Sequence, residues 1–285
     1  MLAAGVLGIS SSLLKKVAEA GAGAVVTKSI GLEPCIGYPN PTVVNINFGL
    51  LNAMGLANPG IKAFSKDMAE LKRLKVPVIV SIFASNERDF AKLAEETEKA
   101  GATALELNVS CPHIQGVSQI CQDTDLLFEI IKSVKASVKI PVFTKISPNV
   151  TDISTVAKAA EDAGSDAVTA INTIRAMAID TETGRPILSN KIGGLSGPAI
   201  RPIAVRCVYE ISKVLKIPII GCGGVSSWKD ALELILAGAT AVQIGTALKN
   251  GRLNIFREVV SGLKNYLEEK EYTGVKDIIG LSHKY

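Results

Sequence analysis

The chain has 285 residues, a net charge of +4 and 47% hydrophobic residues, which is typical of a globular protein. No uninterrupted apolar run approaches the roughly 20 residues that a membrane helix needs, and the first residues lack the basic region and cleavage site of a signal peptide. Lysines and arginines are scattered, so nothing indicates nucleic-acid binding. We therefore expect a cytoplasmic protein with no membrane or nucleic-acid partner.

The cysteines and histidines limit the redox chemistry that the chain can support. Five cysteines at wide spacing fit neither a disulfide framework nor a four-cysteine iron–sulfur or zinc site. Two histidines exclude a histidine-rich metal site. We expect no bound metal, so any redox activity would require an organic cofactor.

A short repeat indicates the architecture. An Ala-Gly pair that follows a helix-like stretch and precedes an apolar run occurs four times, at Gly21, Gly101, Gly164 and Gly238. Glycine ends helices well because it tolerates the left-handed conformation. Continuous apolar runs rich in β-branched residues suit parallel strands that are covered on both faces. The expected strands are residues 1–4, 24–27, 76–83, 104–109, 140–146, 167–171, 217–220 and 241–244.

Eight strands alternating with helices predict an α/β fold, a single (β/α)8 TIM barrel over residues 1–285. The rival, a doubly wound open sheet, would have a GxGxxG turn after its first strand, and none is present. Residues 31–59 after the second strand and 173–198 after the sixth are too long for simple turns. Both loops leave the carboxyl ends of strands, where barrel enzymes place their active sites.

Glycine-rich turns follow the last two expected strands. Gly223 and Gly224 follow the seventh strand, and Gly245 and Thr246 follow the eighth. Glycines let backbone N–H groups approach an anion closely, and barrels commonly bind phosphate at this pair of loops. The sequence therefore predicts a phosphate site there.

Polar side chains occupy the ends of other expected strands, where a packed core would exclude them. These residues are Lys28, Asn108, Lys145, Asn172 and Thr173. Cys111 lies just beyond the fourth strand, and Pro112 keeps it in a loop over the barrel mouth. A loop thiol can serve as a general base once its pKa suits the task.

Taken in chain order, these motifs resemble those of dihydroorotate dehydrogenases, specifically the class I catalytic subunits of the 1B type. The resemblance covers nearly the whole chain. The matching segments are TKS at 27–29, NAMGLAN at 52–58, NVSCP at 108–112, TK at 144–145, INT at 171–173, GGLSG at 193–197, GCGG at 221–224 and QIGTA at 243–247.

The resemblance implies FMN as the cofactor. It implies that the FMN phosphate lies at Gly223, Gly224, Gly245 and Thr246, with Gly197 nearby. It further implies that Lys145 faces the pyrimidine edge of the flavin. The other flavin contacts that it implies are Ala4, Gly5, Lys28, Ser29, Asn108 and Ile171.

The resemblance also implies the reaction, which is oxidation of (S)-dihydroorotate to orotate in de novo pyrimidine biosynthesis. Cys111 would remove the C5 proton of dihydroorotate while C6 gives a hydride to FMN. Backbone amides of Met54, Gly55 and Leu56 would receive the orotate carboxylate. The other implied substrate contacts are Lys28, Asn52, Asn108, Asn172 and Thr173.

The family implies partners as well: a homodimer of barrels and a separate electron-transfer subunit that carries FAD and an iron–sulfur cluster.

Three different functions remain compatible with the residues. The segments NVSCPH and SPNVTDI also resemble dihydropyrimidine dehydrogenases, which act on uracil or thymine, although residues 52–56 suit a substrate with a carboxylate. A flavin-free barrel and a non-catalytic flavin-binding subunit are the second and third.

Overall fold

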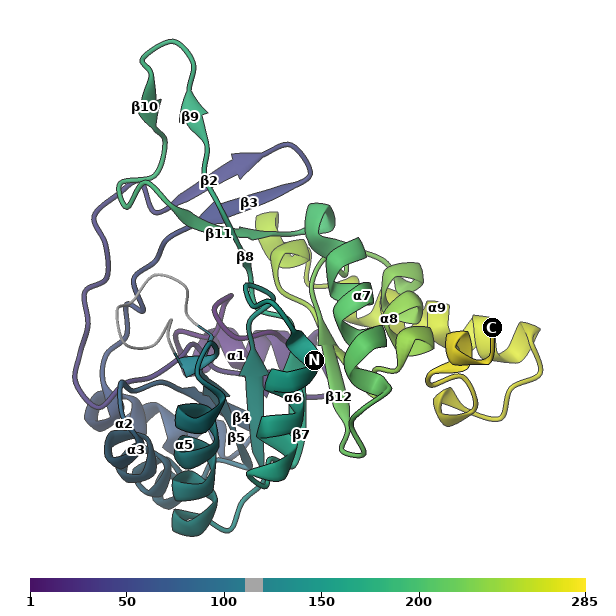
Figure 1. The fold of residues 1–285 in the computed structure, drawn as a ribbon, viewed down its shortest axis with the longest axis horizontal. Coiled ribbons are helices and arrows are strands. Elements are labelled where there is room, and N and C mark those ends of the chain that lie inside the picture. Colours follow the sequence, from purple (N-terminus) through teal and green to yellow (C-terminus); the bar gives the residue numbers. More distant parts are fainter. Residues whose placement is uncertain (111–119) are drawn as a thin grey trace.

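The computed structural model describes residues 1–110 and 120–285, and its centre is a curved sheet of parallel strands (Figure 1). Seven strands pair in the order β1-β4-β5-β6-β7-β12-β13. Their bounds are Val25–Val26 (β1), Val78–Ile82 (β4), Ala104–Asn108 (β5), Val142–Ile146 (β6), Ala167–Ala170 (β7), Ile219–Cys222 (β12) and Ala241–Gln243 (β13). The chain therefore has an α/β, TIM-barrel-like fold, and these seven strands coincide with predicted strands to within a few residues.

The predicted first strand, residues 1–4, is wrong as a strand. The structure has a single parallel bridge there, between Leu2 and Ile244, because the chain turns away at Gly5, whose φ is +88°. The N–H of Leu2 still donates to the carbonyl oxygen of Ala24 at 3.0 Å, and the N–H of Ala3 donates to that of Ile244 at 2.9 Å. This short N-terminal segment therefore bridges the two outer strands of the sheet.

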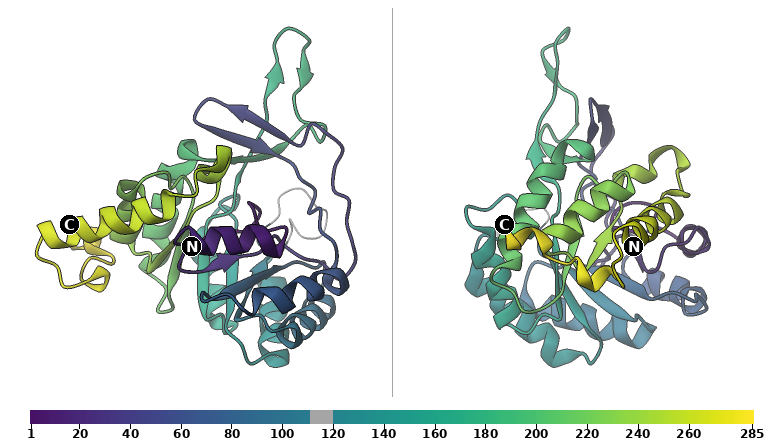
Figure 2. Two further views of the ribbon diagram at one scale, coloured as in Figure 1. Left: turned by 180° about the vertical axis from the view of Figure 1, so that it is seen from behind. Right: turned by 90° about the vertical axis from the view of Figure 1, so that its right-hand side faces the viewer.

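Amphipathic helices cover the outer face of the sheet (Figure 2). In α3 the buried residues are Phe90, Leu93, Ala94 and Thr97, which lie on one face of the helix, and Gly101 ends the helix in the left-handed conformation. The α-helices are Ser11–Glu19 (α1), Ile61–Leu71 (α2), Glu87–Ala100 (α3), Thr124–Ser137 (α5), Ile153–Asp162 (α6), Arg201–Ser212 (α7), Trp228–Ala237 (α8) and Ile255–Glu269 (α9). The 3-10 helices are Pro198–Ile200 (η1), Thr246–Gly251 (η2), Val275–Asp277 (η3) and Leu281–Lys284 (η4).

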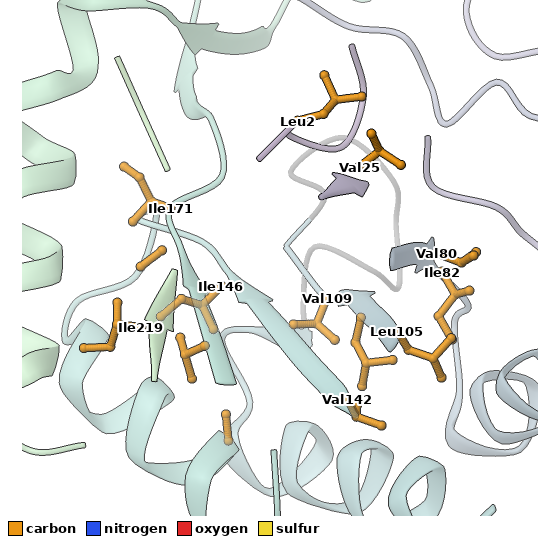
Figure 3. Close-up of a cluster of buried hydrophobic side chains, with 14 of the residues drawn as sticks. Leu2, Val25, Val80, Ile82, Leu105, Val109, Val142, Ile146, Ile171 and Ile219 are labelled. Atoms are coloured by element: carbon orange, nitrogen blue, oxygen red, sulfur yellow. The ribbon is translucent and has the colours of Figure 1, made fainter. Parts of the chain in front are cut away.

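Side chains from many strands meet in one apolar core (Figure 3). Val80, Leu105 and Val142, on three neighbouring strands, are fully buried. Leu2 of the N-terminal segment belongs to the same core. In the part of the chain that the structure describes, no helix is long and apolar enough to cross a membrane.

The two long connections pair with each other into a second, antiparallel sheet of order β2-β3-β11-β8. Its strands are Val43–Ile46 (β2), Gly49–Asn52 (β3), Ile174–Ala176 (β8) and Gly193–Ser196 (β11). A further two-stranded hairpin, Ile179–Asp180 (β9) with Arg185–Pro186 (β10), extends away from the body of the molecule (Figure 1). Residues 31–59 and 173–198 thus build one wall beside the carboxyl ends of the parallel strands.

Candidate active site

A cavity of about 420 Å³ lies between the carboxyl ends of the parallel strands and the antiparallel sheet, a size typical of small-molecule sites. All the predicted cofactor and substrate positions within the described residues line it. They are Ala4, Gly5, Lys28, Ser29, Asn52, Met54, Gly55, Leu56, Asn108, Lys145, Ile171, Asn172, Thr173, Gly197, Gly223, Gly224, Gly245 and Thr246. Cys111, the predicted base, lies outside the described residues.

One end of the cavity is formed by the turn that follows β12. Gly223 and Gly224 have φ values of +133° and +77°, and a Cβ on Gly224 would lie 2.6 Å from the Cβ of Arg201. Glycine is therefore required where the turn packs against α7. Within the described residues, the N–H groups of these two glycines have no protein acceptor, so they are available to bind an anion.

The start of α8 holds this turn in place. Asp230 accepts hydrogen bonds from the backbone N–H of Ser226 at 3.0 Å and from its hydroxyl at 2.9 Å, and it pairs with Arg201. Burial acts to raise the pKa of Asp230, but these hydrogen bonds and the guanidinium hold it below its ordinary value. Asp230 is therefore ionised at neutral pH and fixes the geometry of the turn.

Hydrogen bonds also connect polar side chains at the ends of β1, β5 and β7. The amide of Asn108 donates to Ser29 Oγ at 2.9 Å, and the hydroxyl of Ser110 donates to Asn108 Oδ1 at 3.2 Å. The amide of Asn172 donates to Ser110 Oγ at 2.7 Å. This chain of contacts fixes the orientation of two predicted substrate-binding amides, and it includes Ser110, which we did not predict.

Lys28 lines the same cavity as these amides, and only 8% of its surface is exposed. Burial lowers the pKa of Lys28 below the ordinary value of lysine, because the ammonium is partly removed from water. A cation in this position favours an anionic ligand.

The antiparallel sheet contributes the opposite wall of the cavity. The Asn52 amide donates to the carbonyl oxygen of Gly194 at 3.2 Å, which ties β3 to β11. Gly55 and Leu56 both have positive φ, +68° and +52°, so the backbone bends sharply beside the cavity. Successive N–H groups in such a bend form a concavity that suits a carboxylate.

At the wall of the cavity, Lys145 is held by Glu106 and Gln243, which were not among the predicted site residues. Lys145 Nζ lies 3.6 Å from Glu106 Oε1 and donates to Gln243 Oε1 at 3.3 Å. Glu106 occupies the middle of β5, within the predicted strand 104–109, and is fully buried. A charged residue inside an apolar strand needs a partner, so its position was the signal that could have identified it.

The sequence model of the family described as "Dihydroorotate dehydrogenase" matches residues 1–267 of this chain. The chain belongs to the dihydroorotate dehydrogenase family. Many curated proteins match it as well. One of them, "Dihydroorotate dehydrogenase B (NAD(+)), catalytic subunit" from Pyrococcus furiosus, is 52% identical over 285 residues, which cover 100% of this chain and 94% of that protein.

A protein of the same name from Methanocella arvoryzae is 50% identical over 285 residues and is covered to 93%. Among solved structures, the crystal structure of DHODH in complex with ferulenol from Eimeria tenella superposes with a TM-score of 0.86. That match covers 100% of this chain and 85% of the Eimeria chain, at 24% identity. At this identity the structural similarity concerns the fold, whereas the family assignment rests on the sequence matches.

Proposed function

We propose that this chain is the catalytic subunit of a class 1B dihydroorotate dehydrogenase and oxidises dihydroorotate to orotate in pyrimidine biosynthesis. The observation that carries this proposal is a single cavity with three kinds of binding group. Backbone N–H groups of Gly223 and Gly224 lie at one end, the buried Lys145 lines the wall, and the amides of Asn108 and Asn172 lie at the strand ends. The glycine N–H groups suit a phosphate, the lysine suits a flavin ring, and the amides suit a pyrimidine.

The residues present fit FMN. The glycine N–H groups after β12 supply donors for its phosphate, and Gly245, Thr246 and Gly197 line the same end of the cavity. Lys145 would hold the pyrimidine edge of the ring, where a cation favours the anionic reduced form. Bound FMN supplies the acceptor for the hydride that leaves C6 of dihydroorotate. The remaining proposed contacts are Ala4, Gly5, Lys28, Ser29, Asn108 and Ile171.

The substrate would lie between the hydrogen-bonded amides and the antiparallel sheet. Asn52, Asn108, Asn172 and Thr173 supply donors and acceptors for a pyrimidine ring, and Lys28 supplies a positive charge. The backbone N–H groups of 54–56 would bind the ring carboxylate, because the two positive φ values create a concavity there. This arrangement favours dihydroorotate over a dihydropyrimidine without a carboxylate.

Cys111 would act as the base that removes the C5 proton of dihydroorotate. The residue just before it, Ser110, hydrogen-bonds both amides that we assign to the substrate, Asn108 and Asn172. Oxidation then removes one hydride from C6 and one proton from C5, which balances the conversion to orotate.

Variants of Cys111 test this function. We expect Cys111→Ala to bind FMN as the wild type does and to reduce it more than a hundredfold more slowly with dihydroorotate, because general-base catalysis typically contributes about 10²- to 10⁴-fold. Rapid mixing and the flavin absorption measure the rate. Unchanged reduction would contradict the base assignment, and a wild-type chain that forms no orotate with any electron acceptor would contradict the function.

We further propose that the chain works as a homodimer and passes electrons to NAD through a separate subunit with FAD and an iron–sulfur cluster. In the described residues, no group of three or more histidine, cysteine or acidic side chains is placed to hold a metal. The cluster would belong to that subunit, because the five cysteines of this chain are too widely spaced for a four-cysteine site. Turnover with NAD should appear only when that subunit is added, which a reconstitution assay measures.

A further inference from the structure

Glu106 carries an unusual buried charge below the cavity. Its side chain is fully buried, and Oε1 is the one buried side-chain oxygen or nitrogen of the described residues that has no hydrogen-bond partner. A buried carboxylate is costly to keep unless an opposite charge or several donors compensate it. Glu106 is therefore expected to have a role that offsets this cost.

The contacts of Glu106 show which group its charge compensates. Glu106 Oε2 accepts hydrogen bonds from the amide of Gln243 at 2.6 Å and from the hydroxyl of Thr169 at 3.0 Å. Oε1, the oxygen without a hydrogen bond, lies 3.6 Å from Lys145 Nζ. Gln243 completes a triangle because its amide oxygen accepts from the same ammonium at 3.3 Å.

Few other charged groups face this ammonium. The thiol of Cys222 at the end of β12 lies near Lys145, and the amino group of Met1 lies near Cys222. Burial raises the pKa of the Cys222 thiol, so that group is neutral at physiological pH. Glu106 is consequently the anion that balances Lys145.

We propose that Glu106 is a positioning residue that, together with Gln243, holds the Lys145 ammonium charged and in place at the wall of the cavity, and would thereby tune the reduction of bound FMN. The part that concerns FMN rests on the function proposed above. The part that concerns Lys145 rests only on the geometry of the chain.

The electrostatics of Lys145 support this role. Burial acts to lower the pKa of Lys145, but the charge of Glu106 and its close contact with the ammonium outweigh it, and the pKa lies above its ordinary value. Without the carboxylate, burial would dominate and the ammonium would lose its proton at a lower pH. Lys145 would then take up a proton when the flavin becomes an anion.

The coupling between the two residues can be measured without FMN. Glu106→Gln leaves a buried cation without its counter-ion, and Lys145→Met leaves a buried anion, so each variant should be less stable than the wild type. The double variant removes both charges, and its loss of stability should be clearly smaller than the sum of the two single losses. Denaturant unfolding of the four proteins gives this comparison. Additive losses would overturn the proposal, and the double variant remains informative even where Glu106→Gln alone fails to fold.

The effect on the cofactor is tested by the reduction potential of bound FMN, measured from neutral to alkaline pH. We expect a steeper decrease with pH in Glu106→Gln than in the wild type, because Lys145 then gains a proton on reduction. Thr169→Val is the matched control, since it removes a hydrogen bond from the same carboxylate and keeps the charge; its pH profile should follow the wild type. Parallel profiles for all three proteins would overturn the inference while the proposed function stands, whereas a wild type that binds no FMN would overturn both.

Discussion

Lys28 is a charged side chain that the fold holds almost out of water. Because burial lowers its pKa, the folded chain binds fewer protons than the unfolded chain between the folded pKa and the ordinary value. The contribution of Lys28 to stability therefore rises with pH through that interval. A bound anionic ligand has the opposite effect on the pKa of Lys28, because it stabilises the ammonium.

Orotate affinity should consequently decrease as the pH rises through the lowered pKa of Lys28. In Lys28→Met we expect binding to be weaker by about 2 kcal/mol, the lower range for loss of one partner of a buried charge pair, and to lose this pH dependence. Titration of the flavin absorption with orotate at several pH values measures both effects. A Lys28→Met profile that still follows the wild type would show that another group binds the anion.

At the scale of elements, the first turn of α8 controls the glycine turn after β12. Asp230→Asn should lose about 1–3 kcal/mol of stability, because a charged acceptor of three hydrogen-bonding groups is replaced, and FMN should dissociate faster. Its contribution is present above the ordinary pKa of aspartate and is lost as the pH falls through the lowered pKa of Asp230.

Glu233 offers a matched control for this experiment. It also pairs with Arg201, at 3.1 Å, but its side chain is 49% exposed, and exposed ion pairs contribute about 0–1 kcal/mol. Glu233→Gln should therefore keep wild-type stability and FMN retention, measured by thermal unfolding and by flavin release. If Asp230→Asn and Glu233→Gln had equal effects, Asp230 would not be the residue that holds the glycine turn in place.

At the scale of the whole molecule, the N-terminal segment joins the two edges of the parallel sheet. Leu2→Ala should cost about 2–5 kcal/mol, the usual range for truncating a fully buried leucine. Ile9→Ala, at a side chain that is 57% exposed, should change stability by less than about 0.5 kcal/mol. Denaturant unfolding measures both, and a small loss in Leu2→Ala would mean that the sheet does not depend on this segment.

The parallel strands were predictable because a short, mainly apolar run indicates a strand that is buried on both faces. The antiparallel sheet was not, since it pairs residues far apart in the sequence: Asn52 and Gly194, which are 142 positions apart, lie side by side in β3 and β11. Each of these strands has only three or four residues, which is too short to carry a periodic signal. The two segments were recognisable only as long loops near the site.

The site was predictable to a similar extent. Residues that stand out in the sequence, such as Lys145 at a strand end and Gly224 in a glycine-rich turn, line the cavity. They meet there because the carboxyl ends of parallel strands converge. The supporting residues Gln243 and Ser110 have ordinary side chains in ordinary positions, so only their hydrogen bonds identify them. The structure does not describe Cys111, and its role stays a prediction.

The central claim, that this chain oxidises dihydroorotate with a bound flavin, is tested most directly by anaerobic mixing of the purified protein with substrate. The flavin absorption is recorded after addition of dihydroorotate and, separately, of dihydrouracil, which lacks the ring carboxylate. The account predicts bleaching by dihydroorotate alone. Bleaching by dihydrouracil alone, or a protein that binds no flavin, would contradict it.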